Sequence, residues 1–198
     1  MLFNLYFVKI ALLAIVFLAQ IKKRSLSVSF VKYFFLFSFL TIFGINLYYS
    51  FLQYQIWASD KIGQYFITED KSYFPRYLFT HKFFEPYLIS LAVALFSFFI
   101  LRILNRKAGS RFFYNEEPYL CALAIFLSGN PGWFFYLITL FSFHLFLSFF
   151  FLIKNKIKSI NENTSRVSFL YLWLPSALFV ILLSGWLSKF YFWYVLEI

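Results

Sequence analysis

The chain has 198 residues, of which 62% are hydrophobic, 27% are aromatic and only 13% are charged. Soluble domains carry about a quarter charged residues, and one of this length could not bury 33 phenylalanines. Together with a mean hydropathy of +0.75, this composition predicts an integral membrane protein. It excludes a disordered chain, a disulfide scaffold and an ordinary cytosolic enzyme.

Few residues in the chain are suited to metal or cofactor chemistry. The single cysteine, Cys121, excludes an intrachain disulfide, and with only two histidines, His81 and His144, a His-rich metal site is not expected. No glycine-rich phosphate-binding motif is present. We therefore expect no cofactor and no metal.

Six apolar segments follow one another along the chain. They cover about Leu2–Gln20, Val28–Phe51, Tyr87–Leu104, Pro118–Ser128, Trp133–Ile153 and Val167–Ser188. A spanning helix needs roughly 20 apolar residues, and only Pro118–Ser128 is far shorter than that. We expect one all-α membrane domain, residues 1–198, that forms a polytopic helix bundle of about six transmembrane helices. Five spans plus a re-entrant helix is the alternative.

Local signals refine these segments. The first one predicts a retained anchor rather than a cleaved signal peptide, because its basic cluster, residues 22–24, follows the apolar stretch. The sequence from Ser128 to Gly132 predicts a type II turn, with Pro131 before Gly132, that closes a tight helical hairpin. Pro175 predicts a kink in the last segment.

The basic residues are unevenly distributed between the two sides of the predicted bundle. With the 22–24 loop placed inside, twelve Lys and Arg residues fall inside and five outside, while Lys9 lies within the first segment. This bias predicts that both termini are outside, and it explains the net charge of +10 without nucleic-acid binding. We expect the chain to be integral to a membrane, the plasma (inner) membrane of a prokaryote, with the lipid bilayer as its surroundings.

The segment from about Gln53 to Glu85 is the one sizeable stretch outside the apolar segments. It is rich in Trp, Tyr and Phe, which is too aromatic for a disordered linker. We expect an aromatic-rich extramembrane loop at 53–85 that forms an interfacial helix or a cap on the bundle.

Three residues in two regions are candidates for chemistry on residue type alone. Glu116 and Glu117 precede Pro118, which is typical of a helix amino terminus and is the structural alternative to a catalytic role. His144 lies near the centre of an apolar segment, where an ionisable group is a functional candidate. Its structural alternative is a neutral imidazole that is hydrogen-bonded to a neighbouring helix.

One stretch resembles a family of membrane enzymes. Residues 115–124 (NEEPYLCALA) are similar to the helix that type IV prepilin peptidases open with their second catalytic aspartate. Gly129–Gly132 falls where that family has a hairpin turn, and Leu172–Pro175 is similar to its later motif. Asp70, with the following Phe74–Leu78, resembles the region of the first aspartate.

This resemblance implies a membrane aspartyl peptidase, or a degenerate relative of one, with Glu116 and Asp70 as its catalytic pair. The chain departs from the family in having Glu at the position of the second aspartate. An odd number of spans between the two residues also predicts that they lie on opposite membrane faces. Carboxylates so placed cannot share a proton.

Three functions therefore remain open. We favour a non-catalytic assembly, scaffold or complex-subunit protein with a protein partner or a second copy of the chain bound at 53–85, because no acidic residue lies deep in a span. The first alternative is a prepilin-peptidase-like membrane aspartyl peptidase. The second is a small-molecule-binding subunit of a transporter, with the aromatic loop closing over the ligand.

Overall fold

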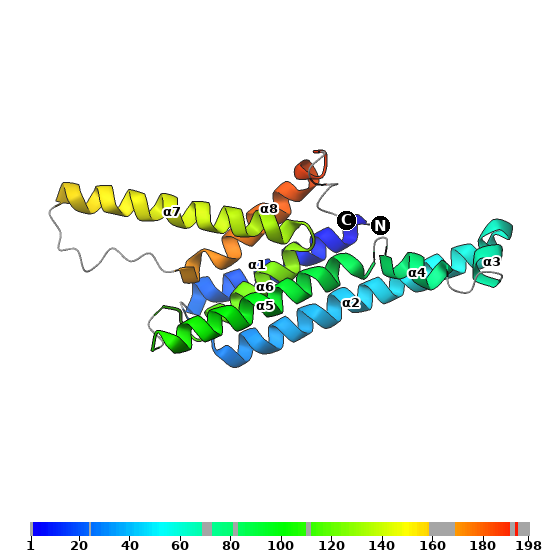
Figure 1. Ribbon diagram of the computed structural model, residues 1–198, viewed down its shortest axis with the longest axis horizontal. Helices are drawn as coiled ribbons and strands as arrows, with labels where there is room; N and C mark the ends of the chain where they lie inside the picture. Colours follow the sequence, from blue (N-terminus) through cyan, green and yellow to red (C-terminus); the bar gives the residue numbers. More distant parts are fainter. Residues whose placement is uncertain are drawn as a thin grey trace.

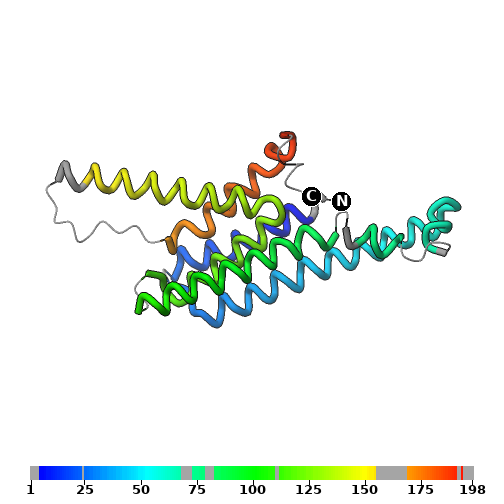
Figure 2. The backbone as a smooth tube through the Cα atoms, viewed as in Figure 1, coloured from blue at the N-terminus to red at the C-terminus, as the bar shows by residue number. Residues whose placement is uncertain are grey.

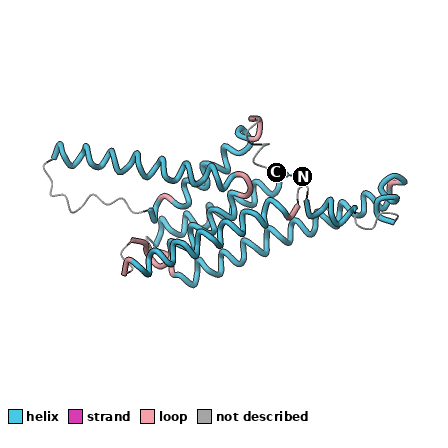
Figure 3. Tube along the Cα trace, viewed as in Figure 1, coloured by secondary structure: helices cyan, strands magenta, loops and turns pink. Residues whose placement is uncertain are grey.

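The computed structural model describes residues 2–23, 25–68, 73–80, 83–109, 112–158, 169–190 and 193. This part of the chain is built from helices and contains no strand (Figures 1 and 3). The elements are α1 (Leu2–Lys23), α2 (Val28–Ser59), α3 (Lys61–Thr68), α4 (Tyr73–Thr80), α5 (Glu85–Lys107), α6 (Glu117–Ser128), α7 (Gly132–Lys158), the 3₁₀ turn η2 (Phe169–Tyr171) and α8 (Trp173–Leu187). The predicted all-α bundle is confirmed.

Five of these helices are long and apolar enough to cross a membrane, namely α1, α2, α5, α7, and α8 together with η2. The sixth apolar helix, α6, has 12 residues, which gives it a length of about 18 Å. That is short of the roughly 30 Å hydrocarbon core of a bilayer. Among the described residues, the alternative of five spans plus one shorter helix therefore fits better than six full spans. The fold is that of a polytopic helical membrane protein.

Helix boundaries follow from local chemistry. Ser27 caps α2, since its hydroxyl accepts a hydrogen bond from the backbone N–H of Phe30 at 3.2 Å. The residue that follows the end of α6, Gly129, has φ +72° and ψ 176°, a region open essentially to glycine alone. The hairpin between α6 and α7 is thus as tight as predicted. Its turn differs from the prediction, because Gly129 and not Gly132 has a positive φ and the Asn130–Pro131 peptide bond is cis.

The kink predicted at Pro175 is wrong. Helix α8 begins at Trp173, so Pro175 is its third residue and lies in the first turn. Backbone N–H groups in a first turn have no carbonyl partner within the helix, and proline is tolerated there. The residues just before α8, Phe169–Tyr171, form the short turn η2 instead of the start of a longer helix.

Helix α6 lies in the middle of the bundle, antiparallel to α5 and α7 (Figure 2). All its residues except Tyr119 are buried. The Ser90 hydroxyl of α5 donates to the Phe126 carbonyl of α6 at 3.4 Å, and the Phe126 ring contacts Phe35 and Phe39 of α2, with centroids 5.8 and 6.1 Å apart. The short helix therefore fills the space between α2 and α5.

Helix α2 extends well past the rest of the bundle (Figure 1). Its 32 residues make it about 48 Å long, and it continues to Ser59 where the sequence predicted a loop from Gln53. Helices α3 and α4 pack at this far end. Trp57 is the centre of the packing, since its ring lies 5.1 Å from Phe74 and 5.0 Å from Tyr77, centroid to centroid. We call residues 54–59 with α3 and α4 the aromatic arm.

The other end of the bundle is rich in basic residues. The carboxyl ends of α1 and α5 and the amino end of α2 meet there (Figure 1), and the last turns of α1 and α5 contain Lys22, Lys23, Arg106 and Lys107. We call this the basic end. The amino end of α6 also faces it, at the opposite end of the bundle from the aromatic arm.

Candidate functional site

Two glutamates begin α6, and both are buried. Glu116 is the cap residue and Glu117 the first helical residue, followed by Pro118. Their exposed fractions are 5% and 1%. Negative charge at this position interacts favourably with the positive end of the helix dipole. The predicted helix amino terminus is thus confirmed.

Each glutamate is held by donors from other parts of the chain. The Glu117 carboxylate accepts the backbone N–H of Tyr114 at 3.1 Å on Oε1 and the Trp173 indole N–H at 2.9 Å on Oε2. Glu116 Oε1 accepts the Ser25 hydroxyl at 2.8 Å. We call these five residues the glutamate cluster. It joins α6 to the α1–α2 connection on one side and to α8 on the other.

The electrostatics of the cluster are set by burial. No described Lys, Arg or His forms an ion pair with Glu116 or Glu117. Glu117 lies outside the five candidate spans, and burial raises the pKa of its carboxyl above 4.5. The hydrogen bonds from Trp173 and Tyr114 oppose this rise, and the neighbouring Glu116 adds to it.

A second polar contact lies beside the cluster. The Gln20 side-chain amide near the end of α1 donates to the Leu170 carbonyl of η2 at 2.6 Å and is buried. Leu170 precedes Trp173 by three residues, so Gln20 and Glu117 both hold the segment that leads into α8. In this segment the Phe169 ring stacks on His144 of α7, with centroids 3.9 Å apart and planes 2° from parallel.

The predicted site residues are not gathered into one site. Glu116 and Glu117 lie together at the basic end, whereas Asp70, the partner that the resemblance implied for Glu116, lies outside the described residues. His144 stacks on Phe169, and the Phe169 ring in turn lies 5.5 Å from the Trp173 ring, centroid to centroid, so two stacked rings separate His144 from the hydrogen bond to Glu117. Cys121 is one turn beyond Glu117 on α6, with an exposed fraction of 2%. No three metal-binding side chains come together in the described ranges.

The geometry of the glutamate cluster suits a structural role. The two carboxylates of an aspartyl-peptidase dyad share a proton directly, and among the described residues no hydrogen bond joins Glu116 to Glu117. Both Glu117 oxygens already accept N–H donors. A buried carboxylate with a donor on each oxygen holds its neighbours in a fixed arrangement.

Comparison with known proteins gives no relative: no family model matches the chain, and neither the curated proteins nor the solved structures contain a significant match. The resemblance to prepilin peptidases therefore stays a prediction. Sequence reasoning also missed Ser25, Gln20 and Trp173 as partners within the site. One signal was available, because Gln20 is an uncharged polar residue in an apolar helix and such residues commonly bond across a bundle.

Proposed function

We propose that this chain is a non-catalytic subunit or assembly scaffold of a membrane complex, bound to its protein partner through the aromatic arm. The bundle anchors it in the plasma membrane of a prokaryote, with the basic end facing the cytoplasm in accordance with the positive-inside rule. The observation that carries the proposal is the aromatic arm itself. It is a folded element that projects from the bundle (Figure 1), and several of its apolar side chains are exposed.

The arm is ordered by its own aromatic packing. Besides the contacts of Trp57, the Phe66 and Tyr73 rings lie 4.8 Å apart and join α3 to α4. Its outer surface remains apolar, since Ile62 is 72% exposed and Ile56 and Tyr65 are exposed as well. Exposed aromatic and aliphatic side chains on a rigid element are typical of a protein-binding surface.

The glutamate cluster supports the non-catalytic part of the proposal. Its most buried carboxylate, on Glu117, is engaged by Trp173 and Tyr114. A peptide substrate would have to break these hydrogen bonds and separate α6 from α8 before it reached the carboxylate. Each broken bond to a buried charged group costs about 1.5–3 kcal/mol.

Site-specific photo-crosslinking tests this function. A photoreactive phenylalanine analogue replaces Ile62 of the arm in one strain and Phe146 of α7 in another, in native membranes of the producing cell. Phe146 is a matched control because it is also largely exposed, at 69%, but lies on a span. We expect a protein adduct of one mass from Ile62 and none from Phe146.

The outcomes separate the possibilities. An adduct of twice the chain's mass would identify the partner as a second copy of this chain. Lipid adducts alone from Ile62, or the same protein adducts from both positions, would contradict the proposal. A proteolytic activity of the purified chain that Glu117→Gln abolishes would favour the peptidase alternative instead.

A further inference from the structure

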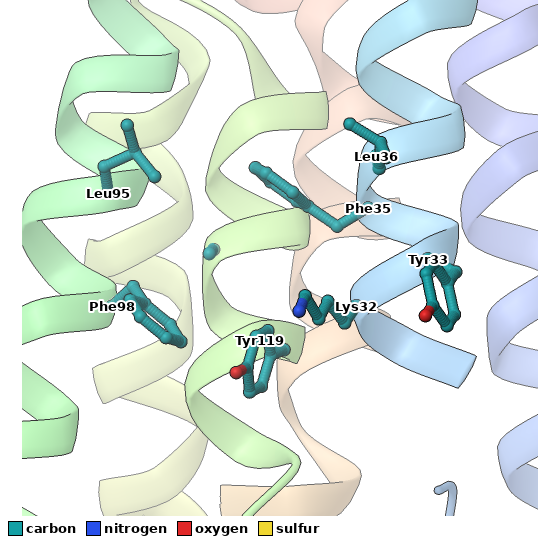
Figure 4. A pocket seen from close by; sticks show the side chains of 8 residues that line it. Lys32, Tyr33, Phe35, Leu36, Leu95, Phe98 and Tyr119 are labelled. Carbon is teal, nitrogen blue, oxygen red and sulfur yellow. The ribbon is translucent and has the colours of Figure 1, made fainter. Parts of the chain in front are cut away.

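A groove runs between α2 and α5, and α6 forms its floor. Its deeper part has a volume of about 260 Å³ and is lined by Lys32, Phe35, Leu95 and Ala122 among others. Figure 4 shows Lys32 reaching from α2 toward Tyr119 of α6, with Phe98 and Leu95 facing them from α5. The groove exists because α2 and α5 are held apart by the short helix between them.

The groove continues toward the basic end. A second hollow of about 290 Å³ shares Phe98 and Tyr119 with the first and adds Arg102 and Asn115 to the lining. The Arg102 guanidinium lies 5.9 Å from the centre of the Phe98 ring, a cation–π distance. The two hollows therefore form one groove whose mouth is polar and whose depth is apolar.

The change from a polar mouth to an apolar interior of the groove matches the change from lipid headgroups to acyl chains across a membrane leaflet. Lys32 lies four residues after the start of α2, and Arg102 five residues before the end of α5, so both are about 6–8 Å from the helix ends at the basic end. Leu95 is about 10 Å further in, because seven residues separate it from Arg102. Cationic groups thus lie at the level of lipid headgroups and apolar side chains at the level of acyl chains.

The charge of the side chains that line the groove indicates which class of lipid headgroup fits it. Both charged residues that line the groove, Lys32 and Arg102, are cationic, and neither forms an ion pair with another described residue. The nearby carboxylates of Glu116 and Glu117 are turned away, since they bond to Ser25 and Trp173 and do not line the groove.

We propose that this groove binds an anionic phospholipid, whose phosphate lies between Lys32 and Arg102 and whose acyl chain runs along Phe35 and Leu95. The inference is independent of the partner-binding function of the aromatic arm. Asn115 is exposed at the mouth and contributes an uncharged donor toward the glycerol and phosphate oxygens.

Native mass spectrometry of the full chain in a neutral detergent tests the proposal. Dioleoyl-phosphatidylglycerol and dioleoyl-phosphatidylcholine are titrated separately, and inorganic phosphate serves as a third probe. We expect one phosphatidylglycerol to bind more tightly than phosphatidylcholine. The double variant Lys32→Gln/Arg102→Gln weakens its binding roughly 30-fold, which is about 2 kcal/mol for two headgroup contacts.

The matched control is Arg106→Gln/Lys107→Gln, which removes two charges from the same end of the bundle but outside the groove lining. It should change binding less than threefold. A groove-filling variant, Leu95→Trp, tests the acyl-chain site without changing charge, with Ile100→Trp on the same helix as its control. It should lower the binding of phosphatidylglycerol while Ile100→Trp leaves it unchanged.

Equal binding of the two lipids by the unaltered chain would overturn the proposal. So would an equal loss in the charge variant and its control, or unchanged binding in Leu95→Trp. Competition by inorganic phosphate at a concentration comparable to that of the lipid would show that the basic mouth is a site for free anions, which also overturns it.

Discussion

The hydrogen bond between Trp173 and Glu117 provides the sharpest test of the glutamate cluster. Replacing Trp173 with Phe removes the indole N–H that reaches Oε2 at 2.9 Å and leaves that oxygen buried. A hydrogen bond to a charged group contributes about 1.5–3 kcal/mol. Hydrogen bonds between membrane helices average only about 0.6 kcal/mol. Because the acceptor is a carboxylate with an exposed fraction of 1%, we expect the higher range.

A double-mutant cycle isolates this energy from the change in ring size. Glu117→Met removes the acceptor, and the double variant with Trp173→Phe should be more stable than the sum of the two single effects predicts, by about 1.5–3 kcal/mol. Unfolding is followed by far-UV circular dichroism as sodium dodecyl sulfate is added to neutral micelles. Trp186→Phe in the same helix is the control, because Trp186 is 56% exposed and its loss should cost less than about 0.5 kcal/mol.

An interaction energy below about 0.5 kcal/mol would refute the reasoning, because the hydrogen bond would then add nothing beyond ordinary helix packing. A larger effect of Trp186→Phe than of Trp173→Phe would refute it as well. Either result would remove the structural role of the cluster and reopen the question of what the two buried carboxylates do.

Three further predictions follow from single features. The free energy of unfolding should fall as the pH rises from about 4.5 through the raised pKa of Glu117, because in this range the folded state holds a proton that the unfolded state releases. Unfolding curves of Glu117→Gln should lack this pH dependence. Gly129→Ala should lower the free energy of unfolding by about 1–3 kcal/mol, given a φ of +72°, whereas Gly44→Ala, in a helix with open space around it, should raise it by up to about 1 kcal/mol. In a Cys121→Ala background, Ile62→Cys and Asn115→Cys should react with an impermeant thiol reagent from opposite sides of the membrane; labelling from one side would contradict the arrangement in Figure 1.

Apolar length was enough to predict the helices, because any chain that crosses a bilayer must satisfy its backbone hydrogen bonds within each span. In the described part of the chain, each of the six apolar segments contains one of the helices. The boundaries were less predictable: α2 continues to Ser59, eight residues past Phe51, where its apolar run was expected to close. Polar residues such as Gln53 and Gln55 do not end a helix, so composition alone could not locate its end.

The glutamate cluster shows where sequence reasoning stops. The pattern of two acids before Pro118 predicted a helix amino terminus, a local feature that the structure confirms. The donors come from far along the chain, since Ser25 is 91 residues from Glu116 and Trp173 is 56 residues from Glu117. No spacing rule connects such residues, and only the packing of α6 between its neighbours brings them together.

The two proposals concern opposite ends of the molecule, and this makes them separable. The groove mouth lies at the basic end with Arg102, whereas the arm is at the far end of α2 beyond Tyr54. Since α2 is a continuous helix between them, a lipid in the groove would meet the same helix that carries the arm. If the two sites are coupled through α2, Lys32→Gln/Arg102→Gln should reduce the crosslinking yield at Ile62 in native membranes. An unchanged yield, in a variant that has lost phosphatidylglycerol binding, would show that lipid and partner bind independently.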